Sequence, residues 1–287
     1  MSEPSFTLEK HQVRRAFERA ARDYERAAGL QRDIGERLLA RLDVIRLTPS
    51  WILDLGCGTG FCAQALRRRY RQAEVIGLDI APAMLREARR GDGWFQRGHW
   101  LAGDAERLPF ADAGFDMVLS NLALQWCDPD RVFGEVARVL RPGGVFMFTS
   151  FGPDTLRELR HAWAAVDDAP HVHGFIDMHD LGDALVRAHL AEPVMDVDRL
   201  TLTYSDVMSL LRELKEIGAH NVTRGRSPAL TGKSRFARFR AAYEAQARGG
   251  RIPATYEVVY GQAWGPLAAH SGVAVPLTQL RRPRNSI

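Results

Sequence analysis

The sequence is poor in cysteine and has no apolar run long enough to cross a bilayer. Its three cysteines, Cys57, Cys62 and Cys127, suit neither a disulfide framework nor a zinc cluster, because no histidine joins the first two at ligand spacing. The first residues, Met1–Ser5, lack the apolar core of a secretory signal. These absences predict a cytoplasmic protein that binds no metal.

The N-terminal part is rich in arginine, but it does not have the composition of a transit peptide. Residues 14–46 also contain six acidic residues, and transit peptides are poor in acids. The 287 residues are 46% hydrophobic and 26% charged, which is ordinary for a chain that buries a globular core. The net charge of +4 is compatible with an acidic partner, although a plain solvated surface explains most of it equally well.

The most informative stretch is residues 51–60, where a short apolar strand runs into a glycine-rich turn. It has the pattern Asp-x-Gly-x-Gly-x-Gly, formed by Asp54, Gly56, Gly58 and Gly60. Glycines let the backbone turn sharply and approach a ligand closely. Asp79 ends the next apolar run, at a spacing suited to the hydroxyls of a ribose. The pattern predicts a nucleoside-containing cofactor, and it differs from the G-x-G-x-x-G fingerprint of dinucleotide-binding proteins.

Strand and helix patterns alternate through the first half of the chain, after two expected helices between residues 8 and 46. Strands are expected at 51–55, 74–79, 99–103, 115–121 and 144–151, and helices at 61–70, 82–90 and 129–140. Such alternation predicts a parallel sheet with ligands at the carboxyl ends of its strands. The glycine turn, Asp79, Asp104 and Asn121 all fall on that rim.

Three further segments carry a family resemblance. They are Gly103-Asp-Ala-Glu-Arg-Leu-Pro-Phe110, Phe115-Asp-Met-Val-Leu-Ser-Asn121 and Leu140-Arg-Pro-Gly-Gly-Val-Phe-Met-Phe148. Together with the glycine motif they resemble the class I S-adenosylmethionine-dependent methyltransferases, over roughly residues 45–152. The resemblance implies an α/β, Rossmann-like fold. Its mostly parallel seven-stranded sheet would have an antiparallel last strand, N-terminal helices and a helical insert over the active site.

S-adenosylmethionine would be held by its methionine, ribose and adenine parts. Gly56–Gly60 would bring backbone amides to the methionine part, Asp54 would receive its ammonium, and Asp79 would take the ribose hydroxyls. The remaining cofactor assignments are Ile80 and Met84 over the adenine, Asp104 and Ala105 at its edge, Asn121 beneath the sulfonium, and Gln31 closing from the N-terminal helices. Met84 fits a helix core equally well.

The pattern changes beyond residue 152. Helices are expected at 154–166, 177–190 and 205–217, followed by a basic segment at 232–248, and strands at 193–204 and 254–264. We therefore expect four parts: an N-terminal helical lid (1–46), a cofactor-binding core (47–152), the rest of the sheet with a substrate-selecting helical insert (153–266), and a disordered tail (267–287).

A second resemblance narrows the acceptor. The segments that carry it are 15–24, 119–126, 150–160, 175–182, 214–221 and 254–258. They are similar to the malonyl-acyl-carrier-protein O-methyltransferases of biotin synthesis, across about residues 9–264. The resemblance implies methyl esterification of the free carboxyl of malonyl-acyl-carrier protein. The ester hides a charge that is costly to bury, so that chain elongation towards pimelate becomes possible.

A carboxylate acceptor is already ionised at neutral pH, so no general base is expected. For the malonyl carboxylate, Lys215 is the first candidate and Arg157 the second. Other substrate-positioning candidates are Tyr24, Gln125 and Trp126. Carrier proteins are typically acidic, and the candidate docking residues are Arg235, Arg238, Arg240 and Arg248, with ordinary solvated charge as the alternative.

Other functions remain compatible with the same cofactor motifs. They include methylation of another small acceptor or a quinone, and an arginine hydroxylase that assists a respiratory complex. A module that binds S-adenosylmethionine without chemistry is a further alternative. Methylation of RNA is disfavoured, because Ser120-Asn-Leu-Ala123 stands where amino-group methyltransferases have an Asn-Pro-Pro-Tyr type motif.

Overall fold

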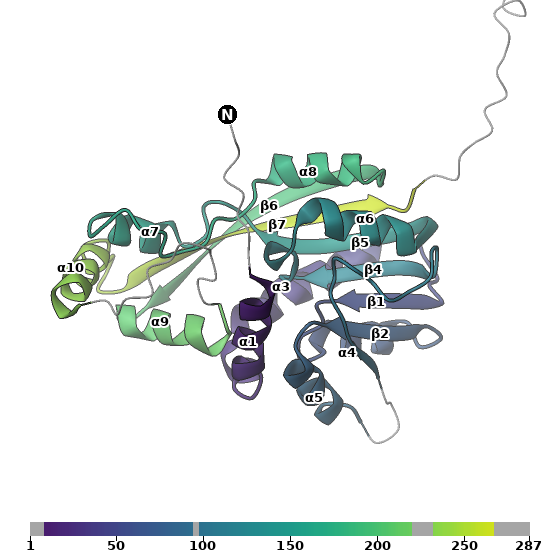
Figure 1. The fold of residues 1–287 in the computed structure, drawn as a ribbon, viewed down its shortest axis with the longest axis horizontal. Helices are drawn as coiled ribbons and strands as arrows, with labels where there is room; N and C mark the ends of the chain where they lie inside the picture. The colour runs from purple at the N-terminus through teal and green to yellow at the C-terminus, as the bar shows by residue number, and fades with distance from the viewer. Residues whose placement is uncertain (1–8, 94–97, 220–231, 267–287) are drawn as a thin grey trace, which may run out of the picture.

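The computed structural model describes residues 9–93, 98–219 and 232–266. Within these ranges the strands form one seven-stranded sheet of order β3-β2-β1-β4-β5-β7-β6 (Figure 1). The strands are β1 Trp51–Leu55, β2 Glu74–Asp79, β3 His99–Ala102, β4 Phe115–Asn121, β5 Leu140–Phe151, β6 Ala191–Tyr204 and β7 Ile252–Trp264. Neighbouring strands are parallel except at β7, which runs antiparallel to both β5 and β6. The predicted class I methyltransferase topology is confirmed.

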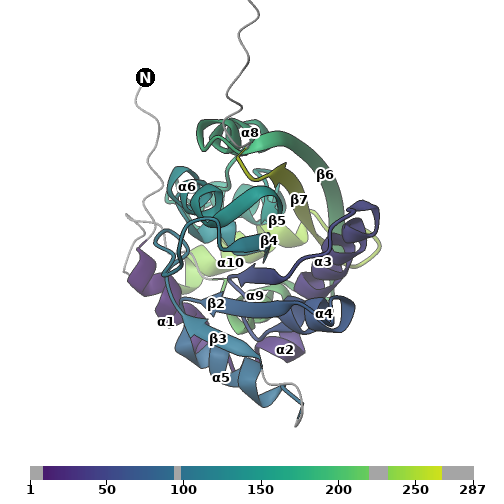
Figure 2. The same cartoon turned by 90° about the vertical axis from the view of Figure 1, so that its right-hand side faces the viewer.

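Helices cover both faces of this sheet, as Figure 2 shows, with α3 and α4 on one side and α6 and α8 on the other. The helices are α1 Lys10–Ala20, α2 Tyr24–Ala27, α3 Gly29–Ala40, α4 Phe61–Arg69, α5 Pro82–Arg90, α6 Pro129–Val139, α7 Arg157–Ala164, α8 Met178–Arg187, α9 Val207–Glu216 and α10 Lys233–Glu244. There are also two 3₁₀ helices: η1 Arg41–Val44 lies between α3 and β1, and η2 Leu124–Trp126 lies between β4 and α6. No helix in the described part of the chain has both the length and the apolar character needed to span a bilayer.

The side chains of β5 show how one strand serves two cores. Phe146 and Phe148 face α6 and α8, and Phe133 of α6 packs with its ring centroid 5.4 Å from that of Phe148. Val145 and Met147 point to the opposite face, towards the core that contains α3 and α4. Alternation along a strand therefore buries both faces of the sheet and fixes its register.

The N-terminal segment differs from the prediction of two helices. The structure has three helices there, because the chain leaves helical geometry after Ala20 and again at Ala28, where φ is −82° and ψ is 33°. A second difference concerns β5, which begins at Leu140 because that residue pairs with Phe115. The backbone still turns within this strand, at Gly143, which has a φ of 76°.

The C-terminal half gathers its helices at one end of the molecule. Figure 1 shows α7, α9 and α10 together at the left, beside the long strands β6 and β7, whereas α8 lies apart from them. Helices α9 and α10 occupy the connection between β6 and β7, which is where the helical insert was expected. The predicted disordered tail, 267–287, lies outside the described residues.

Candidate functional site

The glycine turn lies at the carboxyl end of β1, against the end of β2. The amides of Gly56 and Cys57 both donate to the carbonyl of Leu78, at 2.8 and 3.0 Å. Gly56 has a φ of 71°, and a Cβ there would lie 2.2 Å from that of Ala123. Gly60 has a φ of 87°, and a Cβ there would lie 2.5 Å from the indole of Trp100. Gly56 and Gly58 line cavities, whereas Gly60 serves the packing of the turn.

The first cavity, which we call the rim cavity, lies above the ends of β1, β2 and β4. It encloses about 660 Å³ of empty space, part of it open to solvent. This volume falls in the range of small-molecule sites. Its walls bring together most of the sequence-predicted cofactor residues, namely Tyr24, Gly56, Gly58, Asp79, Ile80, Met84, Asp104, Ala105 and Asn121. Residues from α1, Lys10, Val13 and Phe17, close one side of it.

Asp79 is held by backbone amides at the floor of the rim cavity. One carboxylate oxygen accepts from Gly58 N at 2.9 Å, and the other accepts from Ala81 N at 2.8 Å. Burial raises the pKa of Asp79, while the two amides oppose that shift. Each carboxylate oxygen retains capacity for a further donor, which suits a diol ligand.

Asp104 is joined to α1 by a lysine that the sequence analysis did not select. The ammonium of Lys10 lies 2.5 Å from Asp104 and 2.8 Å from Glu106. Burial lowers the pKa of Lys10, whereas Cys127, Asp104 and Glu106 raise it, and the net shift is upward. No local sequence signal marks Lys10, because its partners stand about ninety residues away in the chain.

A second cavity, the loop cavity, lies behind the glycine turn and is lined by Tyr24, Glu25, Gln31, Arg32, Asp54 and Thr59 among others. Two buried acceptors in its wall, Asp54 Oδ2 and Gln31 Oε1, have no hydrogen-bond partner. Burial raises the pKa of Asp54 to about 7. Two unsatisfied acceptors in the wall of one cavity fit the ammonium of an amino-acid ligand, so these residues suit the methionine part of S-adenosylmethionine.

Arg32 supplies a cation to the same loop cavity. Its guanidinium donates to Glu25, which also accepts from the hydroxyl of Thr59 at the glycine turn. The sequence analysis missed Arg32, although it stands next to Gln31 and faces the same space. A carboxylate ligand would find a guanidinium here that is already oriented by Glu25.

A third and larger cavity, the inner cavity, extends beneath α7 and α9 and encloses about 1110 Å³, including its opening. Aromatic and aliphatic residues make up most of its wall: Trp126, Phe151, Leu156, Leu159, Trp163, Val172, Phe175, Leu211, Leu214, Ile217 and Tyr256. Gln31 is shared with the loop cavity and Trp126 with the rim cavity. The three spaces therefore meet near these two side chains.

The inner cavity holds a histidine that is neutral at physiological pH. His173 is 7% exposed, its Nε2 atom has no partner, and its ring centroid lies 4.9 Å from that of Trp126. Burial, and secondarily Arg160, lower the pKa of His173 to about 4. Among the described residues that line this cavity there is no carboxylate, and the one formal cation is Lys215, an exposed residue that also lines an outer groove.

Of the predicted residues near β4, Asn121 and Trp126 line cavities and Gln125 does not. The side chain of Asn121 donates to the carbonyl of Gln31 at 2.9 Å and accepts from Thr149 at 2.7 Å, so it ties α3 to the sheet. Trp126 packs edge-on against Phe17 of α1, with centroids 5.4 Å apart. Gln125 donates to the carbonyl of Leu122 at 2.7 Å and does not line any of the three cavities.

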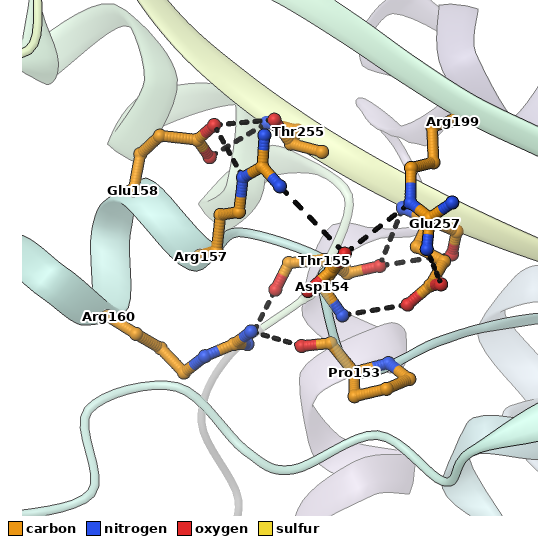
Figure 3. A network of polar contacts seen from close by, with 9 residues as sticks. All are labelled: Pro153, Asp154, Thr155, Arg157, Glu158, Arg160, Arg199, Thr255 and Glu257. Carbon is orange, nitrogen blue, oxygen red and sulfur yellow. Dashed lines mark hydrogen bonds and ion pairs between the residues drawn. The ribbon is translucent and has the colours of Figure 1, made fainter.

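Arg157 lies away from the three cavities, in the polar network that Figure 3 shows between α7 and β7. Its guanidinium lies 3.8 Å from Asp154 and 3.5 Å from Glu158. Arg160, one helical turn further on, donates to the carbonyl of Thr155 at 2.6 Å and lies near enough to His173 to lower its pKa. The sequence reasoning thus chose an arginine on the side of α7 that does not face the inner cavity.

The two remaining substrate candidates border the cavities. Tyr24 is shared by the rim and loop cavities, and burial raises the pKa of its hydroxyl. Lys215 stands at the mouth of the inner cavity, near Ala219. The rest of the segment expected around it, His220 and Asn221, lies outside the described residues. The described ranges contain no cluster of histidine, cysteine and carboxylate side chains arranged to hold a metal ion.

Comparison with known proteins agrees with this geometry. Residues 53–148 match a family model described as a methyltransferase domain. A malonyl-[acyl-carrier protein] O-methyltransferase of Methylovorus sp. is 49% identical over 283 residues, covering 96% of this chain and 95% of that protein. The enzyme of the same name from Laribacter hongkongensis is 52% identical, covering 92% of each chain.

A solved structure shows the same fold at much lower sequence similarity. The YcgJ protein of Bacillus subtilis superposes with a TM-score of 0.57 and 17% identity, covering 81% of this chain and all of that one. The fold, the cavities at the strand ends and the near full-length sequence similarity all point to the same family. The chain belongs to the malonyl-[acyl-carrier protein] O-methyltransferase family, within the class I methyltransferases.

Proposed function

We propose that this protein transfers the methyl group of S-adenosylmethionine to the free carboxylate of malonyl-acyl-carrier protein. The methyl ester then enters the synthesis of the pimeloyl part of biotin. The observation that carries the proposal is the similarity, along nearly the whole chain, to relatives named for this reaction. The inner cavity supports it as well, because its wall is mostly aromatic and aliphatic, contains no described carboxylate, and shares Gln31 with the loop cavity.

The N-terminal segment 1–46 acts in this proposal as a lid over the cofactor-binding core 47–152. Asp54 Oδ2 and Gln31 Oε1 receive the ammonium of the methionine part, and both atoms are buried without a partner. Arg32 faces its carboxylate, and Asp79 accepts from the ribose hydroxyls. When bound, S-adenosylmethionine supplies an electrophilic methyl group on a sulfonium.

The adenine end lies in the outer part of the rim cavity. Ile80 and Met84 offer apolar contacts there, and the amide of Ala105 offers a donor. Asp104 already shares its carboxylate with Lys10, so an adenine amine would join an existing ion pair. Phe17 completes the cover from α1.

The segment 153–266 prepares the acceptor by removing water from it. A malonyl carboxylate is ionised at neutral pH, so the chain needs no residue to take a proton from it. Trp126, Trp163 and Phe175 exclude solvent from the inner cavity, and His173 offers a polar atom without adding charge. Proximity and desolvation carry most of the rate enhancement in such a transfer.

Lys215 draws the acceptor to the mouth of the inner cavity, and Tyr24 lies where the cofactor and acceptor spaces approach each other. An ammonium at the mouth attracts the carboxylate without remaining paired to it at the reacting position. A tight ion pair there would weaken the nucleophile, because the negative charge would be partly neutralised.

The test is a transfer assay with labelled S-adenosylmethionine and malonyl-acyl-carrier protein, with acetyl-acyl-carrier protein as the control. We expect label in a base-labile ester on the malonyl form alone. Protein that binds S-adenosylmethionine by calorimetry yet labels neither form would overturn the proposal. It would leave a methyltransferase or hydroxylase of another substrate.

A further inference from the structure

A groove on the outside of the molecule runs between α1 and α9. Four exposed cations line it, Arg15 and Arg19 from α1 and Arg212 and Lys215 from α9. The remaining polar lining residues are Glu9, His11, Gln12, Asp23 and Glu216. We call this the outer groove. Figure 1 shows the two helices that form it side by side.

The cations of the outer groove carry charge that the rest of the described chain does not neutralise. Arg15, Arg19, Arg212 and Lys215 make no ion pair or hydrogen bond with another described residue. By contrast, Asp23 and Glu216 both lie near Arg26, at 3.3 and 3.6 Å. Two of the three acids of the groove are therefore shared with Arg26, and the third, Glu9, accepts from Gln12. With four cations against three acids, the net charge of the groove is positive.

The arginines of α10 and the turn after it are a weaker candidate surface. Arg235 is paired with Asp167, and Arg240 lies 3.3 Å from Glu244. Arg248 belongs to a tight backbone turn with Arg251. Arg238 and Arg248 are exposed, and their guanidinium groups are not paired with any described residue, so this set of four arginines offers two free cations where the outer groove offers four.

The outer groove adjoins the inner cavity at Lys215. Lys215 lines both spaces, and its neighbours Leu211 and Leu214 on α9 face inward. A carrier protein presents its acyl group on a flexible arm, so it must dock where that arm reaches the reacting centre. Within the described residues, Lys215 marks a place where a basic outer surface and the acceptor space share a wall.

We infer that the acidic carrier protein docks in the outer groove between α1 and α9, with its acyl-bearing arm passing Lys215 into the inner cavity. The inference rests on the proposed function and adds the surface that recognises the partner. Complementary charge of this kind acts mainly on the rate of association and on partner choice.

The experiment compares two malonyl thioesters, one on the carrier protein and one on pantetheine, which has the same arm without a protein. For each variant, the ratio of kcat/KM between the two substrates isolates docking from chemistry. Charge reversal in the double variant R15E/R19E, and separately in R212E, should lower this ratio about tenfold. R238E is the matched control, an exposed helical arginine on the other face, and should change the ratio less than about twofold.

The readouts separate the possible failures. Unchanged ratios in R15E/R19E and R212E, or a large fall in R238E alone, would overturn the docking site. Wild-type protein that methylates neither thioester would refute the proposed function instead. The replaced side chains are exposed, so we expect the variants to fold, and calorimetric binding of S-adenosylmethionine verifies this. R15Q/R19Q and R212Q serve as milder variants if charge reversal harms folding.

Discussion

The cofactor half and the acceptor half of the site differ in the charge of their walls. The described walls of the cofactor half contain four carboxylates, those of Glu25, Asp54, Asp79 and Asp104, against two cations, Lys10 and Arg32. Two buried acceptor atoms there, Asp54 Oδ2 and Gln31 Oε1, have no partner. The described wall of the acceptor half has no carboxylate, a neutral histidine, and a lysine at its mouth. The first half is built to receive a cation, and the second to take a lone anion out of water.

This difference in wall charge indicates how the protein would make the acceptor carboxylate reactive towards a methyl donor. A carboxylate in an apolar cavity is destabilised relative to water, and a nearby cation is its natural counter-charge. Acidic residues in the acceptor half would repel the substrate, and strong cations would hold it too firmly. The asymmetry of the walls is thus itself testable.

The largest expected effect comes from removing the buried charge of the cofactor half. Asp54→Asn should weaken binding of S-adenosylmethionine about a hundredfold, because a charge-assisted hydrogen bond to the ammonium is lost. Titration calorimetry measures this, with the exposed Asp43→Asn as the control variant. Affinity in Asp54→Asn within about twofold of wild type would remove Asp54 from the ammonium site.

The same carboxylate should make cofactor affinity depend on pH. With a pKa of about 7 in the free protein, Asp54 must lose a proton before it can pair with the ammonium. Wild-type affinity should therefore fall about tenfold for each pH unit below 7, and this slope should vanish in Asp54→Asn. An identical slope in both proteins would assign the dependence to another group.

The two halves should also oppose each other in the pH dependence of stability. The folded pKa of Asp54 is raised, so its contribution favours the folded state at low pH and is lost as pH rises from about 4 to 7. The folded pKa of His173 is lowered to about 4, so its contribution is present above about 6.5 and is lost as pH falls towards 4.

Thermal unfolding of the ligand-free protein between pH 4.5 and 8.5 separates these contributions. Asp54→Asn should raise Tm most at alkaline pH, and His173→Gln should raise Tm most at acidic pH. In each case the free energy of unfolding should increase by up to a few kcal/mol at that pH. Parallel pH curves for wild type and either variant would show that the replaced group is not buried as the structure has it.

A smaller effect is expected at the mouth of the acceptor half. Lys215→Glu should lower kcat/KM for a small malonyl thioester about tenfold, mainly through KM, because an exposed acid repels the carboxylate. Lys215→Gln should lower it only about threefold. Equal effects of the two replacements would indicate that shape at this position matters more than charge.

The smallest effect should come from the ion pair that holds α1 over the rim cavity. Lys10→Met removes the contacts to Asp104 and Glu106, which are partly exposed, and should weaken S-adenosylmethionine binding about threefold to tenfold. The matched variant Arg14→Met, on the solvent side of α1, should leave affinity unchanged. Equal losses in the two variants would point to general helix destabilisation.

Much of the fold was predictable because its signals are local. Strands β1, β2 and β4 have the predicted bounds, since each is an apolar run with a local stop signal: β2 and β4 end in a polar residue, and β1 runs into the glycine turn. The break at Ala28 was missed, although Gly29, the next residue, is a local helix-breaking signal. The early start of β5 depends on a partner, Phe115, distant in sequence.

The candidate site likewise has a part that local sequence signals predict and a part that they do not. The glycine turn and Asp79 belong to one short motif, so their placement together on the rim cavity could be anticipated. The inner cavity is assembled from segments near residues 126, 151–175, 211–219 and 256. Most of these segments carry the resemblance to the family, but no local pattern states that they line one space. Neither Arg157 nor Arg160 lines the inner cavity: Arg157 lies by Asp154 and Glu158, and Arg160 donates to backbone carbonyls, contacts that no sequence pattern states.

Helix α1 connects the two ligands through opposite faces. Val13 and Phe17 touch the rim cavity, whereas Arg15 and Arg19 line the outer groove. If cofactor binding holds this helix in place, the carrier protein no longer has to supply that ordering free energy, and the linkage must be reciprocal. On that condition the two ligands bind with heterotropic cooperativity: the methyl donor raises the affinity for the carrier protein by the same factor as the carrier protein raises that for the methyl donor.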